Sequence, residues 1–324
     1  PRGLRSITDH AHEKGIDTIV WFEPERVTPG TWLYDTHPEW LLGADGGQKL
    51  LNLGHPEAWQ WLVDHVEQLL TDQGIDLYRQ DFNMDPLDYW RGADAPDRQG
   101  ITEIRHVTGY LAFWDELLRR RPWLRIDTCA SGGRRNDLET LRRSVPLWRT
   151  DYILEPIGAQ GCTYGISSWI PFHGTGEKEP DAYLFRSMMT PYPNCLWDAR
   201  RTDLNYEELR RLISQWKQVA PNYAGDYYPL TAYSLDRDAW MGWQFHRPET
   251  GEGMVQLFRR EQSIYRAADI VLCGLDRSAT YILTDLDRPD TVREMTGEML
   301  MGTGLPVEIA SRPGALIITY KRKE

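Results

Sequence analysis

Short apolar runs alternate with amphipathic helical patterns from the start of the chain to about residue 225. In the first unit, a helix that Gly15 ends precedes a buried strand at 18–22. Parallel strands need a long crossover connection, which is usually a helix, so this alternation predicts about six βα units around a parallel sheet. The further predicted strands lie at 77–81, 124–129 and 147–151, with weaker candidates at 164–172 and 190–197.

The helices between these strands carry regular apolar stripes. The second helix runs from Pro56 to the residue before Gly74, and the third stops before Pro122. The predicted buried stripes are Leu62, Val63, Val66, Leu69 and Leu70 in the second helix, Ile104, Val107, Leu111, Trp114 and Leu118 in the third, and Leu209, Leu212, Ile213, Trp216 and Val219 in the last.

From about Pro229 the pattern changes to short alternating strands separated by turn-rich segments, which is typical of an antiparallel β domain. We therefore expect an α/β fold in which residues 1–228 form a (β/α)8 TIM-type barrel without its N-terminal strands. A C-terminal antiparallel β-sandwich domain should follow over 229–324. Because the chain opens at Pro1 inside a helical pattern and without Met, we expect a fragment. The four clearest C-terminal strands are predicted at 240–246, 254–258, 279–283 and 315–320.

Composition excludes several classes of function. The net charge of -11 argues against the basic surface that a nucleic-acid binder or a membrane-surface protein needs. The 4 cysteines are widely spaced without a CxxC pair, so we expect free thiols, and we expect neither a metal site nor another cofactor. No apolar run is long enough to span a membrane and no signal peptide is visible, so the expected location is the cytoplasm.

Three of the predicted strands end in the same way. Alternate residues of a barrel strand point inward, and reactive groups collect at the carboxyl ends of the strands. Strand 77–81 places Arg79 and Asp81 on one face, strand 147–151 places Asp151 at its end, and the run from 18 leads to Glu23. A lone carboxylate is more often a helix cap, but three in register favour an active site.

Asp81 and Asp151 suit the two roles of a retaining glycosidase. Their strands are next-but-one neighbours in chain order, which would set the carboxylates on two sides of one pocket. One carboxylate then attacks the anomeric carbon and the other protonates the leaving oxygen. Arg79, on the same face as Asp81, should help keep Asp81 ionised.

Four segments resemble the motifs of glycoside hydrolase family 36, the α-galactosidase family. Residues 21–27 (WFEPERV) are similar to its WFEPEMV, and residues 78–83 (YRQDFN) to its YxKWDMN. Residues 129–137 (CASGGRRND) are similar to its CSGGGGRFD, and residues 148–151 (WRTD) to its WTSD. The motifs occur in the family order over roughly residues 1–225.

The resemblance implies that Asp81 is the nucleophile, that Asp151 is the general acid/base, and that no cofactor takes part. It implies a terminal α-galactoside or oligosaccharide as substrate. Assembly into a homo-oligomer is left as an open possibility. The implied substrate-binding residues are Trp21, Glu23, Arg79, Asn83, Cys129, Gly132, Gly133, Arg135, Asp137 and Trp148.

The sequence departs from the family pattern at several positions. Arg79 replaces a sugar-contacting Lys, and a planar guanidinium is not an equivalent donor. Gln80 replaces a Trp, Arg134 a Gly and Arg26 a Met. The paired-Asp motif of the early barrel strands has no counterpart. A raffinose-synthase-type transglycosidase, an α-N-acetylgalactosaminidase and a non-catalytic glycan-binding barrel therefore stay open as alternatives.

Overall fold

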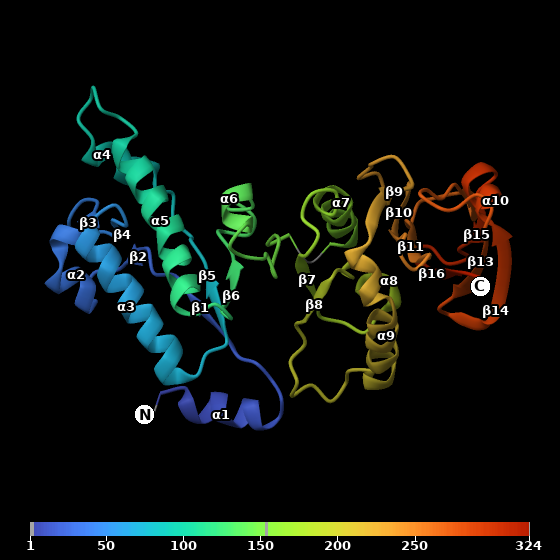
Figure 1. The fold of residues 1–324 in the computed structure, drawn as a ribbon, viewed down its shortest axis with the longest axis horizontal. Coiled ribbons are helices and arrows are strands. Elements are labelled where there is room, and N and C mark those ends of the chain that lie inside the picture. Colours follow the sequence, from blue (N-terminus) through green and yellow to red (C-terminus); the bar gives the residue numbers. More distant parts are fainter. Residues whose placement is uncertain (1–2, 153–154, 324) are drawn as a thin grey trace. The chain divides into compact units, whose positions relative to one another are not determined.

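The structure is a computed structural model that describes residues 3–152 and 155–323. The chain forms two compact units, residues 1–151 and residues 152–324, and each is described by itself (Figure 1). In chain order, the elements of the first unit are α1 (Arg5–Glu13), β1 (Ile19–Phe22), β2 (Arg26–Val27), α2 (Trp32–Thr36), the 3-10 helix η1 (Pro38–Trp40), β3 (Leu41–Leu42), β4 (Lys49–Leu51), α3 (Pro56–Gln73), β5 (Leu77–Gln80), α4 (Leu87–Ala93), α5 (Ile101–Arg120), β6 (Arg125–Thr128) and α6 (Leu138–Leu141).

A three-stranded parallel sheet in the order β1-β5-β6 lies at the centre of the first unit. Val20, Tyr78 and Ile126 stand in one row of the register and project into the main apolar core. Because side chains alternate along a strand, the next row faces the other side of the sheet. The strands expected at 18–22, 77–81 and 124–129 are therefore confirmed.

Helices α3 and α5 lie side by side and cover the apolar face of this sheet (Figure 1). The stripe predicted for α3 is largely correct, because four of its five residues are buried. The stripe predicted for α5 is wrong in part, since Ile104 and Val107 are exposed. The buried face of α5 consists instead of His106, Tyr110, Phe113, Trp114 and Leu117.

The segment expected as a strand at 147–151 does not form one. Val145 makes a single parallel bridge with Asp127 of β6, and this bridge extends the sheet by one position. Pro146 has no N–H to offer, and the N–H of Leu147 donates to the Asp127 carboxylate at 2.9 Å instead of to a strand. Side-chain hydrogen bonding therefore replaces the ladder that the apolar pattern predicted.

The second unit begins with helices and ends with antiparallel strands (Figure 1). Its elements are α7 (Pro156–Ile166), β7 (Gly174–Glu177), α8 (Ala182–Ser187), β8 (Tyr192–Cys195), α9 (Tyr206–Val219), the 3-10 helix η2 (Ala220–Ala224), β9 (Asp226–Pro229), β10 (Trp240–Arg247), β11 (Glu252–Arg259), β12 (Ala267–Ile270), β13 (Thr280–Asp285), β14 (Arg288–Thr296), α10 (Gly297–Gly302), β15 (Leu305–Glu308) and β16 (Gly314–Arg322).

A six-stranded antiparallel sheet in the order β14-β13-β16-β11-β10-β9 dominates the second unit. The four C-terminal strands predicted from the sequence are confirmed as β10, β11, β13 and β16, and the candidate at 190–197 contains β8. The strand candidate at 164–172 is wrong, because α7 runs to Ile166. Glu155 caps that helix by accepting the N–H groups of Ile157 and Gly158 at 2.9 and 2.6 Å.

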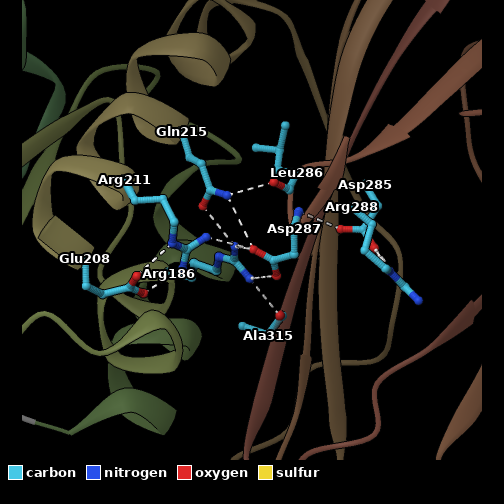
Figure 2. A network of polar contacts seen from close by, with 9 residues as sticks. All are labelled: Arg186, Glu208, Arg211, Gln215, Asp285, Leu286, Asp287, Arg288 and Ala315. Atoms are coloured by element: carbon cyan, nitrogen blue, oxygen red, sulfur yellow. Dashed lines mark hydrogen bonds and ion pairs between the residues drawn. The ribbon is translucent and has the colours of Figure 1, made fainter. Parts of the chain in front are cut away.

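An ion pair between a buried arginine and a partly exposed aspartate joins the helices of the second unit to this sheet. Arg186 of α8 makes a two-pronged pair with Asp287, in the turn after β13, and its side chain is almost completely buried (Figure 2). Gln215 of α9 donates to the Leu286 carbonyl at 2.9 Å, and Arg211 reaches Asp287 at 3.0 Å. These contacts fix α8 and α9 against the edge of the turn.

Two further features of the fold concern the cysteines and the character of the helices. All four cysteines are among the described residues and are free thiols, as the sequence predicted. Within the described ranges, no helix combines the length and the apolar character needed to cross a membrane.

Candidate active site

The face of the parallel sheet opposite the core is polar. Trp21, Arg79 and Asp127 stand in one row across β1, β5 and β6. Asp81 follows the last residue of β5, on the same face as Arg79. The sequence prediction that Arg79 and Asp81 share a face therefore agrees with the register, and the carboxyl ends of three parallel strands bring these groups together.

The Asp81 carboxylate is buried and receives several hydrogen bonds. Its Oδ2 accepts the indole N–H of Trp21 at 3.0 Å, and its Oδ1 accepts the backbone N–H of Phe82 at 2.8 Å. Burial by itself would raise the pKa of Asp81, but hydrogen bonds led by Asn83 and Trp21 outweigh it and lower the pKa below its ordinary value. Asp81 is therefore an anion at neutral pH, as a nucleophile must be.

Arg79 serves a different partner from the one expected. Its guanidinium forms an ion pair with the buried carboxylate of Asp127, and the attraction of Asp127 overcomes burial and raises the pKa of Arg79. The largest effects that lower the pKa of Asp81 are hydrogen bonds, and Arg79 and Asp81 also attract each other. Arg79 remains beside Asp81 and partly exposed, but its charge is largely balanced by Asp127.

Glu23 and Asn83 meet at the end of β1 and β5. The Glu23 carboxylate accepts the backbone N–H of Asn83 at 2.6 Å and forms an ion pair with Arg26. The Glu23 side chain is buried. Glu23 thus holds the backbone two residues after Asp81. The exposed side chain of Asn83 contacts Asp81.

The segment at 129–137, named here the glycine loop, passes next to Asp81. The backbone N–H of Ser131 donates to Asp81 Oδ1 at 3.3 Å. Cys129 is buried at the start of the loop, and burial raises the pKa of its thiol to about 11, so the group is neutral. Ser131 and Gly132 both adopt the left-handed backbone region, with φ of 43° and 81°.

The same loop touches the segment that carries Asp151. A Cβ added to Gly132 would lie 2.9 Å from the backbone nitrogen of Asp151, and one added to Gly133 would lie 2.9 Å from the Arg149 carbonyl oxygen. Only glycine allows this close approach. The Trp148 indole N–H donates to the exposed Asp151 carboxylate at 3.0 Å. The glycine loop therefore connects the surroundings of both aspartates.

Two residues expected to bind substrate serve other partners. The Arg135 guanidinium makes a two-pronged ion pair with Glu25, which is completely buried. Asp137 caps α6, because its carboxylate accepts the backbone N–H of Thr140 at 3.0 Å and the Thr140 hydroxyl at 2.8 Å. A contact of Arg135 or Asp137 with substrate stays a prediction, and both residues line a cavity with Phe82 and Tyr110.

Sequence reasoning missed three residues of this neighbourhood. Asp127 could have been found from the strand alternation, because it lies two residues before Cys129 on the same face. Ser131 acts through its backbone N–H, for which a side-chain pattern carries no signal. Glu25 acts at a distance of 110 positions from Arg135, and no local pattern predicts such a pair.

The described residues contain no cluster of three or more His, Cys, Asp or Glu side chains suited to a metal ion. The carboxylates of Asp127 and Glu23 pair with arginines. The other two carboxylates of the predicted site are Asp81, which is buried, and Asp151, which is exposed. Backbone N–H groups and an indole surround them.

Known proteins resemble this chain in sequence and in fold. The family model described as Melibiase matches residues 1–180, which include both aspartates. The chain belongs to the melibiase family, glycoside hydrolase family 36. Alpha-galactosidase 1 of Pediococcus pentosaceus is 25% identical over 279 residues, covering 80% of this chain and 38% of the relative. The alpha-galactosidase of Escherichia coli is 27% identical over 249 residues, covering 68% of this chain and 33% of the relative. This melibiase-family chain thus spans less than half the length of these relatives.

A variant of the family 36 α-galactosidase AgaA from Geobacillus stearothermophilus, solved in complex with stachyose, has a similar fold. The TM-score is 0.85 at 21% sequence identity, and the match covers 100% of this chain and 47% of the other. The chain therefore has the fold of the corresponding part of family 36 α-galactosidases.

Proposed function

We propose that this melibiase is, or is part of, a retaining α-galactosidase in which Asp81 is the nucleophile and Asp151 the general acid/base. In the first step Asp81 attacks the anomeric carbon while Asp151 donates a proton to the leaving oxygen. In the second step Asp151 removes a proton from water, which displaces the sugar from Asp81. Each proton that Asp151 gives is thus recovered within one turnover.

The observation that carries this proposal is the glycine loop. Its Ser131 N–H contacts the Asp81 carboxylate, and its Gly132 lies against the backbone of Asp151. One short segment therefore sets the positions of both carboxylates. Asp81, buried and kept anionic by hydrogen bonds, suits attack, whereas the exposed Asp151 suits exchange of protons with a leaving group and with water.

The proposed substrates are terminal α-galactosides of oligosaccharides. The match to α-galactosidases supports the sugar, and the stachyose in the AgaA variant complex supports the oligosaccharide class. Trp21, half-exposed beside Asp81, offers an apolar face on which a sugar ring can stack. Cys129, Gly132, Gly133 and Trp148 complete the proposed sugar pocket.

The proposal includes a finer description of the fold. The parallel strands β1, β5 and β6, with the bridge at Val145, belong to a TIM-type barrel assigned to residues 1–228. Residues 229–324 form a C-terminal β-sandwich domain. The fold similarity to family 36 α-galactosidases supports this assignment.

A panel of nitrophenyl α- and β-glycosides tests the function, with proton NMR to follow the anomer released first. We expect cleavage of the α-galactoside and initial release of α-galactose, because two displacements retain configuration. Initial release of β-galactose contradicts the retaining mechanism, and a full-length protein that cleaves no α-galactoside contradicts the activity. Transfer of galactose to added sucrose in preference to water would favour the transglycosidase alternative.

A further inference from the structure

We propose that Arg135 is a positioning residue: paired with Glu25 behind the sheet, it holds the glycine loop so that the Ser131 N–H reaches Asp81. The resemblance to family 36 implies that Arg135 binds the sugar, and the structure shows that it pairs with Glu25. The catalytic consequence rests on the proposed function. The structural consequence, a fixed contact between loop and carboxylate, does not.

The Glu25 carboxylate connects four segments of the first unit. Its Oε1 accepts from Arg135 Nη2 at 2.7 Å and pairs with His106 Nε2 at 2.9 Å. Its Oε2 accepts from Arg135 Nη1 at 2.7 Å and from the side-chain amide of Gln80 at 2.8 Å. Burial would raise the pKa of Glu25, but Arg135 and His106 lower it, so the carboxylate stays charged. A buried charge with all its acceptor sites filled makes a rigid anchor.

Arg135 is held on its other sides by aromatic rings. The guanidinium carbon lies 4.3 Å from the centre of the Phe82 ring and 4.0 Å from that of Tyr110. These two ring contacts and the two-pronged pair with Glu25 restrict the position of the side chain. The backbone of the glycine loop is therefore anchored four residues after Ser131.

The anchor acts on the strand and on the loop together. Gln80 and Asp81 are neighbours with side chains on opposite faces of the sheet. Glu25 therefore binds the side chain of the residue just before the nucleophile. Arg135 ties the loop to the same carboxylate. Ser131 has a strained left-handed backbone, with φ of 43°. Its hydroxyl contacts Arg134 and Asn83 at 2.9 and 3.1 Å, and Arg135 adds a further anchor to the loop, whose loss should let the backbone relax. This relaxation would withdraw the N–H from Asp81.

Several other groups face Asp81 and set the background for this contact. Arg79 of β5 lies beside it, and Asp127 and Cys129 come from β6. Trp21 donates from β1. Phe82 donates its backbone N–H to Asp81 and its ring lies against Arg135. A change at Arg135 can therefore reach Asp81 through the loop and through Phe82.

The test compares Arg135→Lys with Arg186→Lys, a matched variant of the second unit. Arg186 makes a two-pronged pair with Asp287 (Figure 2) and has no part in the site, and its side chain is 2% exposed against 14% for Arg135. Lysine keeps the charge at both positions but loses the two-pronged geometry. Both variants should lose thermal stability. Only Arg135→Lys should lower kcat, by roughly tenfold for one lost charge-assisted hydrogen bond, and raise the pKa of Asp81.

The readouts are the melting temperature, kcat and KM on an aryl α-galactoside, and carboxyl-carbon NMR of Asp81 against pH. Equal kcat and equal Asp81 pKa in the two variants would overturn the positioning role. The NMR measurement of the Asp81 pKa does not require an active enzyme. If the wild-type protein is inactive, the proposed function is refuted, but the NMR comparison still tests the positioning role of Arg135.

A double variant guards against misfolding of Arg135→Lys. Glu25→Gln with Arg135→Met removes both charges and leaves no orphan ion in the core, which is often tolerated. We expect the folded double variant to show the same loss of kcat and the same rise in Asp81 pKa. A folded double variant with wild-type values for both would overturn the proposal.

Discussion

Gly132 offers the sharpest single-residue test of the glycine loop. Gly132→Ala places a Cβ 2.9 Å from the Asp151 backbone nitrogen and 3.3 Å from the Thr150 Cα, and neither is a flexible group. The loop and the Asp151 segment must therefore move apart until the closer contact exceeds about 3.4 Å. Displacements of this size near reacting groups can cost up to about a hundredfold in rate.

The matched control is Gly46→Ala. Gly46 has almost the same backbone, φ 83° against 81° at Gly132, but an added Cβ meets no atom within 4 Å. Alanine in this region costs about 1–2 kcal/mol, so both variants should melt about 2–8 °C below the parent protein. The difference between the two variants isolates the contact with Asp151.

Steady-state kinetics on an aryl α-galactoside and on a natural oligosaccharide provide the assay. We expect kcat/KM of Gly132→Ala to fall between about tenfold and a hundredfold, with the larger loss on the oligosaccharide, whose leaving group needs a proton from Asp151. Gly46→Ala should match the parent enzyme. Equal activities of the two variants would refute the reasoning that the loop positions Asp151.

Three further outcomes follow from the site. Asp151→Ala should slow hydrolysis of natural oligosaccharides far more than that of aryl substrates with acidic leaving groups, and azide should rescue turnover; equal losses without rescue would count against the acid/base role. Trp21→Phe removes a donor to Asp81, so the pKa of Asp81 rises and the acidic limb of the kcat/KM profile moves to higher pH; an unchanged limb contradicts this contact. Because burial keeps the Cys129 thiol protonated, brief treatment with iodoacetamide at pH 7.5 should leave its peptide unmodified by mass spectrometry, and rapid modification would show an accessible thiolate.

The strands of the site could be predicted from the sequence because each combines an apolar face with a charged end. Alternation alone placed Arg79 and Asp81 on the polar face, and the register agrees. The long helices and the C-terminal antiparallel strands were also predictable, since each buries a continuous apolar face. Local periodicity is a sufficient signal wherever the burial is apolar.

Burial of polar groups is what the sequence did not reveal. The buried face of α5 includes His106, because that imidazole contacts the Glu25 carboxylate, whereas Ile104 is exposed. The segment after Pro146 is irregular because Leu147 donates to a side chain. Arg135 carries a family motif, but a motif does not tell which way a side chain points.

The most direct test of the account is covalent labelling of the nucleophile. A 2-deoxy-2-fluoro-galactosyl inactivator should trap the sugar on Asp81, because a retaining mechanism passes through an ester at this carboxylate. Peptide mass spectrometry should find the label on the peptide that contains Asp81, and Asp81→Ala should neither turn over substrate nor take up label while keeping its fold. Label found only on another carboxylate, or turnover by folded Asp81→Ala, would contradict the assignment of Asp81 as nucleophile.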